Sequence, residues 1–348
     1  MRVLVTGHDG YIGAVMVPML QAAGHEIVGL DSQLFEDCTF GDYEQNVHTL
    51  RLDIRDVQLE HLIRFDAVIH LAGISNDPLG NLDPACTYAI NHAGSIRLAR
   101  LSKKAGIGRF IFSSSCSLYG AAASDRVLDE TAPFNPVTPY GKSKVLVEQD
   151  LAGLADDDFS PILLRNATVY GVSPRLRVDL VVNNLVGFAV TTGHVLIMSD
   201  GTPWRPLIHV EDIAQAFLAV LEAPQGLVHN QAFNVGANHQ NYQIREVAGM
   251  VAEIVPNSTV MYAPDGEPDL RSYRVDFSKL SSLFPDFQPR WTLRRGIEQL
   301  LSAFQRHNLT REQFLGSLYL RLDHVKRLLA EGHIDSNLRR ISSPYELS

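Results

Sequence analysis

The chain has 348 residues, of which 45% are hydrophobic and 20% charged, and its formal net charge is −9. This composition is typical of a globular protein and excludes a disordered tail, a collagen and a coiled coil. The length leaves room for about two structural units. A negative charge without a basic stripe argues against nucleic acid and anionic membranes as partners.

The cysteines and the apolar stretches limit where the protein works. Cys38, Cys86 and Cys116 have neither disulfide nor metal-ligand spacing, so we expect no metal site. Unpaired cysteines favour the reducing cytoplasm. No stretch reaches the roughly 20 apolar residues that a membrane-spanning helix needs.

The first half of the chain alternates short apolar runs with helix-length segments. The predicted strands cover residues 3–5, 26–30, 48–52, 67–71, 110–113 and 162–165, and the predicted helices cover 11–23, 86–105 and 138–153. The runs are continuously apolar, which indicates that both faces of the sheet are covered and that the strands are parallel. The pattern predicts an α/β fold of the Rossmann type, with a doubly wound sheet.

The second half has more proline and glycine breaks, and helices return at about 211–222 and 243–254. We expect residues 1–165 to form the first domain, 166–300 mainly a smaller lobe, and 301–348 a helical C-terminal extension. The chain at about 202–235 is expected to return to the first domain. Apolar residues at helical spacing predict one amphipathic helix over 310–338.

Three glycines follow the first predicted strand at the point where the chain must turn into a helix. Gly7, Gly10 and Gly13 are spaced G-x-x-G-x-x-G, with Tyr11 and Ile12 between the last two. A Cβ at these positions would obstruct a pyrophosphate or the neighbouring strand, and the helix N-terminus offers unpaired N–H groups to an anion. The segment predicts a dinucleotide site.

The second and third strands end in acidic residues suited to the adenosine half of a dinucleotide. Asp31 lies where the adenosine ribose is expected, and a carboxylate repels a 2′-phosphate. Neither Ser32 nor Gln33 supplies a compensating cation, so NAD is favoured over NADP. Asp53 and Ile54 are candidates for binding the adenine edge.

A second group of residues could carry proton chemistry. Tyr140 and Lys144 are four residues apart, so a helix places the phenol and the ammonium on one face. An ammonium nearby stabilises a phenolate and lowers the pKa of the phenol. A row of hydroxyls, Ser113 to Ser117, ends the fifth predicted strand, at the sheet edge where ligands bind.

The motifs TGHDGYIG, HLAG, SSSCSLYG and YGKSK, together with Asp31, resemble the extended short-chain dehydrogenase/reductase family, and within it the nucleotide-sugar epimerases and dehydratases. The resemblance covers roughly residues 1–300. It implies that Tyr140 is the catalytic acid/base, that Lys144 binds the nicotinamide ribose and tunes the tyrosine, and that Ser115 hydrogen-bonds the reacting sugar oxygen. It also places Leu71, Ala72 and Gly73 beside an NAD cofactor.

The same resemblance suggests contacts to a nucleotide-diphosphate sugar. Arg205 lies in a G-x-x-x-R-x-x-I-H-V-x-D segment whose arginine approaches the substrate diphosphate, and Arg271 is a second phosphate candidate. Thr168 stands where an asparagine usually contacts the substrate. The remaining expected contacts are Ser75, Asn91, Ser117, Asn183 and Asn184.

The residues after Ser115 bear on the reaction. Dehydratases of the resembled family have an Asp-Glu pair there, whereas this chain has Cys116 and Ser117, which disfavours a 4,6-dehydratase. A redox-neutral epimerase acting at C4, through a 4-keto sugar and transient hydride transfer to NAD, is the leading hypothesis. The alternative is an NAD(P)(H)-dependent dehydrogenase or 4-keto-sugar reductase. Intact Ser115, Tyr140 and Lys144 disfavour a non-catalytic dinucleotide-sensing module.

The resemblance also implies an assembly. Family members use the helices that correspond to 86–105 and 138–153 to form a four-helix bundle between two subunits. We therefore expect a homodimer. Cys116 has two readings, an additional acid/base group or an inert buried thiol.

Overall fold

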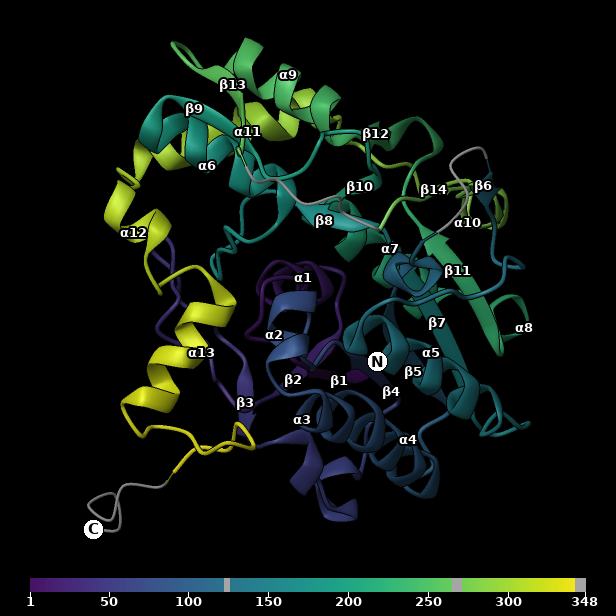
Figure 1. The fold of residues 1–348 in the computed structure, drawn as a ribbon. Helices are drawn as coiled ribbons and strands as arrows, with labels where there is room; N and C mark the ends of the chain where they lie inside the picture. The colour runs from purple at the N-terminus through teal and green to yellow at the C-terminus, as the bar shows by residue number, and fades with distance from the viewer. Residues whose placement is uncertain (122–125, 265–270, 342–348) are drawn as a thin grey trace.

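Seven parallel strands form the central sheet of the computed structural model, which describes residues 1–121, 126–264 and 271–341 (Figure 1). The order across the sheet is β11-β7-β5-β4-β1-β2-β3: β2 and β3 are added on one side of β1, and the later strands are added on the other side, beginning with β4. The strands are β1 (Arg2–Thr6), β2 (Glu26–Asp31), β3 (His48–Arg51), β4 (Ala67–His70), β5 (Arg109–Ser115), β7 (Ser160–Asn166) and β11 (Gln231–Val235). The predicted doubly wound sheet is confirmed.

Helices cover both faces of this sheet, as the continuous apolarity of the strands predicts. Helices α1 and α7 pack on one face, where Leu20 and Phe217 are buried against the strands. Helices α4 and α5 pack on the other, through Leu98 and Val147. These helices are α1 (Gly13–Ala22), α7 (Val210–Glu222), α4 (Ser95–Lys104) and α5 (Pro139–Ala152).

The segment 202–235 contributes only its last part to the central sheet. Strand β11 pairs in parallel with β7. Strand β10 (Trp204–His209) instead lies between β8 (Thr168–Tyr170) and β12 (Asn241–Gln243) in a separate three-stranded sheet.

The connection from β4 to α4 is helical. A helical turn, α2 (Asp77–Leu82), precedes α3 (Pro84–Tyr88), which continues through a π-helical segment, Ala89–Gly94, into α4.

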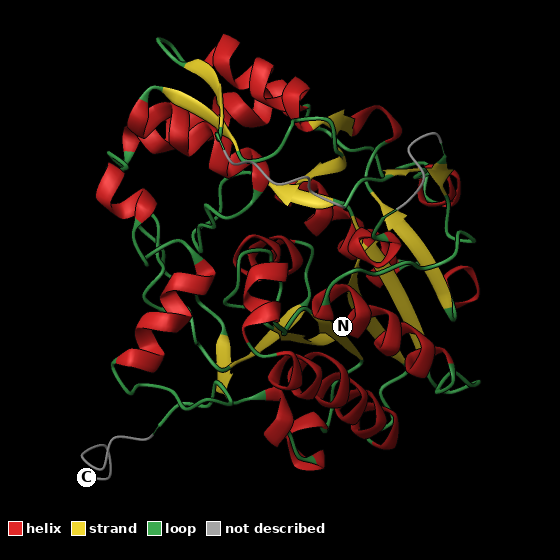
Figure 2. Cartoon of the chain, viewed as in Figure 1, coloured by secondary structure: helices red, strands yellow, loops and turns green. Residues whose placement is uncertain are grey.

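A smaller lobe with its own apolar core lies above the carboxyl edge of the sheet (Figure 2). Its core includes Val186, Val251 and Leu300. The lobe contains α6 (Val181–Thr192), β9 (His194–Ile197), α9 (Ile244–Ile254), β13 (Thr259–Tyr262) and α11 (Leu293–Arg306). Nearby short elements are β6 (Val127–Leu128), α8 (Gln225–Val228), β14 (Arg274–Val275) and α10 (Ser278–Leu283).

The prediction of one helix over 310–338 is wrong. Two helices occupy the segment, α12 (Arg311–Leu315) and α13 (Arg321–Ala330). The break comes at Gly316, whose backbone is extended and where a Cβ would lie 2.5 Å from the Glu312 carbonyl oxygen. Within the described part of the chain, no helix has the length and apolarity needed to cross a bilayer.

His70, at the end of β4, makes the fold sensitive to acid. The ring is fully buried between the Thr6 and Ser95 hydroxyls, at 2.6 and 2.7 Å, and burial lowers the pKa of His70 to about 3. An unfolded histidine titrates near pH 6.5, so between about pH 6.5 and 3 the unfolded chain binds more protons. Stability contributed by the neutral ring is present above about pH 6.5 and is lost as the pH falls through this window.

We therefore expect the free energy of unfolding of the wild type to fall by about 2 kcal/mol more than that of a His70→Asn variant between about pH 6.5 and pH 5. Urea denaturation at several pH values measures both slopes, and the variant corrects for carboxylates that titrate in the same range. Parallel slopes would show that His70 does not titrate on unfolding.

Candidate active site

A cavity of about 870 Å³ lies at the carboxyl edge of the sheet, beneath the smaller lobe. A cavity of this size can hold a large ligand. Most of the predicted site residues line it: Gly7, Gly10, Tyr11, Ile12, Gly13, Asp31, Asp53, Ile54, Leu71, Ala72, Gly73, Ser75, Ser115, Ser117, Tyr140, Lys144, Thr168, Asn184, Arg205 and Arg271.

The glycine loop packs so closely on the segment that follows β4 that Gly7 has no room for a side chain. Gly7 has a φ of +73°, and a Cβ there would lie 2.6 Å from the backbone nitrogen of Ala72. Helix α1 starts at Gly13. The Ala14 and Met16 N–H groups donate to the Gly10 and Ile12 carbonyls, each at 2.9 Å, which leaves the N–H groups of the turn before the helix for a ligand. This loop therefore offers N–H donors and a positive helix end to an anion, which fits a dinucleotide pyrophosphate.

Asp31 lies at the end of β2 with its carboxylate in the cavity. The carboxylate accepts hydrogen bonds from the Gln33 and Asp9 backbone N–H groups, at 2.8 and 3.2 Å. Burial raises the pKa of Asp31, while His8 opposes this shift. A carboxylate with remaining acceptor capacity fits the ribose hydroxyls of the dinucleotide.

Asp53 is less available for adenine than we expected. Both of its carboxylate oxygens are held by the Arg55 guanidinium, at 2.9 and 2.6 Å. Burial by itself would raise the pKa of Asp53, but the hydrogen bonds and charge of Arg55 outweigh it, and the pKa is lowered. Ile54, by contrast, is buried and lines the cavity.

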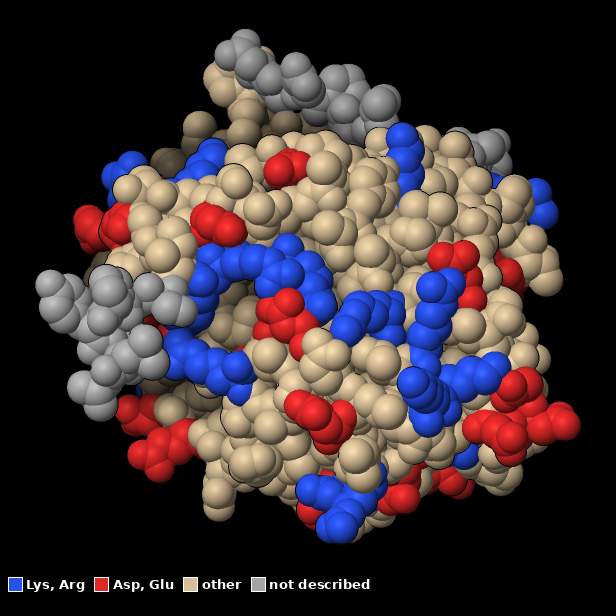
Figure 3. Space-filling model, turned by 90° about the horizontal axis from the view of Figure 1, so that it is seen from below, with Lys and Arg blue, Asp and Glu red and all other residues tan. Residues whose placement is uncertain are grey.

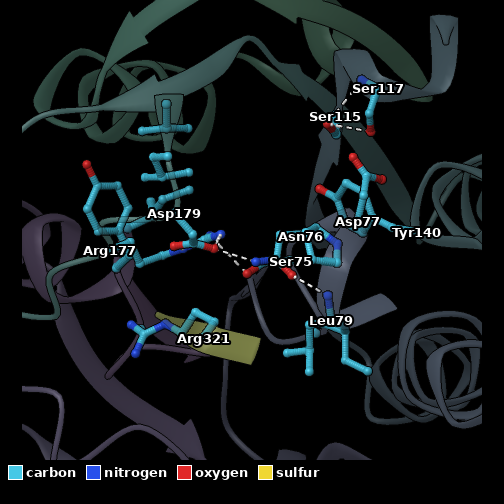
Figure 4. Close-up of a pocket in the computed structure, with 18 of the residues that line it drawn as sticks. Ser75, Asn76, Asp77, Leu79, Ser115, Ser117, Tyr140, Arg177, Asp179 and Arg321 are labelled. Atoms are coloured by element: carbon cyan, nitrogen blue, oxygen red, sulfur yellow. Dashed lines mark hydrogen bonds and ion pairs between the residues drawn. The ribbon is translucent and has the colours of Figure 1, made fainter. Parts of the chain in front are cut away.

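Helix α5 brings Tyr140 and Lys144 to the end of β5. Thr138 caps this helix by accepting the Gly141 N–H at 3.2 Å. The Lys144 ammonium donates to the Ser113 carbonyl at 2.7 Å and lies 5.7 Å from the centre of the Tyr140 ring. The Ser115 hydroxyl accepts hydrogen bonds from the Ser117 N–H and hydroxyl, and Figure 4 shows both serines on the same side of the pocket as Tyr140.

The expectation that Lys144 lowers the pKa of Tyr140 is not met in this structure. Burial raises the pKa of Tyr140, and Ser115 and Arg177 only partly oppose this shift. Burial also lowers the pKa of Lys144 to about 8. Burial is the largest cause of both shifts, and the ammonium donates to the Ser113 carbonyl rather than to the Tyr140 hydroxyl.

The two predicted phosphate arginines enter the cavity from the smaller lobe. Arg205 is 7% exposed; its guanidinium donates to the Trp204 carbonyl at 2.8 Å and lies over the Tyr273 ring. Arg271 forms an ion pair with Asp77. Residues 265–270 of the segment that precedes Arg271 lie outside the described residues.

Two predicted substrate contacts do not line the cavity. The Asn91 amide bonds the backbone of Ile74 in both directions, at 2.7 and 2.9 Å, so it supports the cavity wall instead. Asn183 is fully buried, and its amide contacts both backbone groups of Gly171 and the Arg177 carbonyl. Their polar atoms are occupied within the fold.

The structure favours an inert buried thiol at Cys116 over an additional acid/base group. Its side chain is 1% exposed, does not line the cavity, and donates to the Arg165 carbonyl at 3.2 Å. Burial raises the pKa of this thiol well above its usual range. A thiol in this state is neither an acid nor a base at neutral pH.

Several charged residues of the cavity were missed from the sequence. Arg177 and Asp179 form a bidentate pair, at 3.0 and 2.7 Å, and Figure 4 shows this pair facing Ser75 and Asn76. The alternation of charged and apolar residues in RLRVD was the available signal. Arg321 is another charged lining residue that was missed.

Basic side chains also gather on the surface. Figure 3 shows Lys and Arg around a hollow on one face of the molecule, although the chain as a whole has a net charge of −9. An anionic ligand is therefore attracted by local cations rather than by the overall field.

Comparisons with known proteins agree with this geometry. Over 318 residues the chain is 30% identical to the UDP-glucose 4-epimerase of Mycolicibacterium smegmatis, covering 88% of this chain and 99% of that one. It is 28% identical over 329 residues to the UDP-glucose 4-epimerase of Neisseria gonorrhoeae, covering 86% and 95%.

Solved structures give the same result. The Thermotoga maritima UDP-glucose 4-epimerase with UDP-glucose has a TM-score of 0.76 at 27% identity, and MoeE5 with UDP-glucuronic acid and NAD has 0.74 at 28%. Each comparison covers 88% of this chain and 99% of the other. The model of the NAD dependent epimerase/dehydratase family matches residues 3–236. The chain belongs to the NAD-dependent epimerase/dehydratase family.

Proposed function

We propose that this protein is an NAD-dependent nucleotide-sugar epimerase that acts at C4 of the sugar. The observation that carries the proposal is one cavity shared by Ser115, Tyr140 and Lys144 with the glycine loop and Asp31. The catalytic roles of these three residues are part of the proposal. The relatives are UDP-glucose 4-epimerases, and the T. maritima structure holds UDP-glucose, so a UDP-hexose is the proposed substrate class.

The cofactor would be held by the residues already described. The glycine loop fits the pyrophosphate, Asp31 the adenosine ribose, and Lys144 the nicotinamide ribose. Leu71, Ala72 and Gly73 form the adjoining wall. When bound, NAD supplies the acceptor and later the donor of a hydride.

Side chains of the protein would then remove and return the proton of the C4 hydroxyl. Ser115 would hydrogen-bond the C4 oxygen of the sugar and orient it towards the phenolic oxygen of Tyr140. As phenolate, Tyr140 removes the hydroxyl proton while a 4-keto sugar forms, and it returns the proton after the sugar has turned. Burial raises the pKa of Tyr140, so the cations nearby, Lys144 and Arg177, must favour the phenolate once substrate is bound.

Arg205, Arg271 and Thr168 would bind the nucleotide diphosphate from the smaller lobe, with Ser75, Ser117 and Asn184 nearer the sugar. Arginine suits the bidentate contacts that phosphate oxygens require. In line with these separate roles, we divide the chain into a cofactor domain of residues 1–165, a mainly substrate-binding lobe of 166–300, and an extension of 301–348.

The test separates epimerisation from net oxidation or reduction. The purified protein is incubated with UDP-glucose, UDP-galactose or UDP-glucuronic acid, and the products are separated by chromatography while reduced nicotinamide is followed by its absorbance. We expect a C4 epimer without lasting accumulation of reduced cofactor. Stoichiometric accumulation or consumption would favour the dehydrogenase or reductase instead, and no turnover of any nucleotide sugar would favour the sensing module.

We further propose a homodimer in the cytoplasm. Helices α4 and α5 lie together on one side of the sheet, and Leu146 on α5 is 37% exposed there. Light scattering should give the mass of two chains, and Leu146→Asp should reduce it to one; a monomeric wild type would contradict the dimer.

All three cysteines are free, which supports the proposed cytoplasmic location because that compartment is reducing, and cell fractionation tests it.

A further inference from the structure

The C-terminal extension reaches the cavity from the side of the cofactor loops. Leu320, Arg321 and Leu338 line the cavity together with Leu34 and Phe35, which follow β2. Helix α13 packs against α2 through an apolar cluster of Leu79, Val325 and Leu328. The extension is therefore part of the cavity wall.

Polar contacts fasten this extension to the loops at the adenosine end of the cavity. The His324 ring bonds the Leu34 carbonyl at 3.0 Å, and the Arg340 guanidinium donates to the Ser32 carbonyl at 3.1 Å. The Arg55 guanidinium, which also holds Asp53, donates to the Asn337 carbonyl at 2.9 Å. The contacts hold the extension against the turns that follow β2 and β3.

Arg321 is a buried cation with unused hydrogen-bonding capacity. Arg321 is 3% exposed, and its guanidinium lies 4.0 Å from the centre of the Phe35 ring. The Nη2 group donates to the Arg175 carbonyl at 3.3 Å, whereas Nη1 has no hydrogen-bond partner within the described part of the chain. The guanidinium also interacts with the Cys38 sulfur, but a thiol is a weak acceptor.

The nearby carboxylates are already engaged by other arginines. Asp179 is held in a bidentate pair by Arg177, and Asp9 is held by Arg175 with three contacts of 2.8 to 3.0 Å. Burial lowers the pKa of Arg321 to about 10, so the group remains charged at neutral pH. A buried cation without its own counter-ion is unfavourable until an anion completes the site.

We propose that Arg321 binds the diphosphate of the dinucleotide cofactor, and that the C-terminal extension thereby closes the cofactor site. The inference rests on the proposed function. Both ligands of the proposed reaction carry a diphosphate, but the position of Arg321 favours the cofactor. Arg321 contacts Phe35 in the loop after β2 and donates to the Arg175 carbonyl. The Arg175 side chain in turn binds Asp9 of the glycine loop. Arg205 and Arg271, by contrast, approach the cavity from the smaller lobe.

The test measures ligand affinity of the full-length protein rather than turnover. Nucleotide-free wild type, Arg321→Met and Arg321→Lys are titrated calorimetrically with ADP-ribose, adenosine and UDP. We expect Arg321→Met to weaken ADP-ribose binding about 10- to 100-fold, because it removes charge-assisted hydrogen bonds while keeping the side-chain length. Adenosine and UDP should bind as they do to the wild type, and Arg321→Lys should recover part of the loss.

The matched control is Lys326→Met on the same helix, because Lys326 pairs with Asp323 at the surface and does not line the cavity. This variant should bind ADP-ribose like the wild type. An equal loss of adenosine and ADP-ribose affinity would overturn the proposal in favour of a packing role. A selective loss of UDP affinity would assign Arg321 to the substrate, and unchanged affinities would remove it from either site. A wild type that binds no ADP-ribose would contradict the proposed function itself.

Discussion

Replacing Tyr140 by phenylalanine is expected to slow epimerisation by about 10²- to 10⁴-fold, the usual contribution of a positioned general acid/base. The phenyl ring keeps the packing of Tyr140 at the start of α5, and only the hydroxyl that exchanges the proton is lost. The amount of NAD that copurifies should not change, because the glycine loop and Asp31 are untouched. Chromatographic separation of the epimers measures the rate.

The matched control for this experiment is Tyr262→Phe. Tyr262 is 50% exposed and does not line the cavity, so its hydroxyl should be dispensable. Wild-type activity in the Tyr140→Phe variant would remove Tyr140 from the mechanism. A loss of both NAD and activity would instead indicate that the variant disturbs the cofactor site.

Replacing Arg165 by methionine is expected to destabilise the fold by about 3–5 kcal/mol. The Arg165 guanidinium and the Glu148 carboxylate are 6% and 3% exposed and share three contacts of 2.7 to 3.1 Å. Glu148 also accepts the Ser114 hydroxyl at 2.5 Å. The variant leaves a buried carboxylate without its cation, on the face of the sheet that carries the reactive helix. Urea denaturation measures the loss.

Two further variants separate burial from charge pairing. Arg294→Met breaks the exposed pair with Glu253 and should cost less than about 1 kcal/mol. A double variant, Glu148→Leu with Arg165→Met, should recover much of the stability, because no unpaired charge remains. If Arg165→Met were as stable as the wild type, the buried pair would not be a stabilising element.

The main fold could be predicted from the sequence because its signals are local. The runs at β1, β2, β4, β5 and β7 are apolar on both faces, and only a sheet covered on both sides buries such runs. The glycine spacing is likewise a local requirement, since Gly7 must take a positive φ beside Ala72. Glycine and hydroxyl motifs at strand ends gather at one edge because parallel strands all end there.

The C-terminal extension shows where such patterns fail. Apolar residues at helical spacing from Phe314 to Leu329 predicted one helix, but they face two different cores. Phe314 packs into the lobe core with α6, whereas Val325 packs against Leu79 of α2. Two separate surfaces require a break between the helices, and spacing along the chain carries no information about which surface a residue will meet.

The sequence by itself determined the sheet, the turn of the glycine loop and the spacing of Tyr140 and Lys144 on one helix, because each depends on neighbours within a few residues. The tertiary structure alone decided which polar groups remain available to ligands. The side chains of Asn183 and Cys116 donate to backbone carbonyls. Arg321, from near the C-terminal end of the chain, reaches the cofactor loops, and its Nη1 group has no hydrogen-bond partner within the described residues. Hydrogen-bond satisfaction in a buried site depends on contacts between distant segments, and these exist only once the chain has folded.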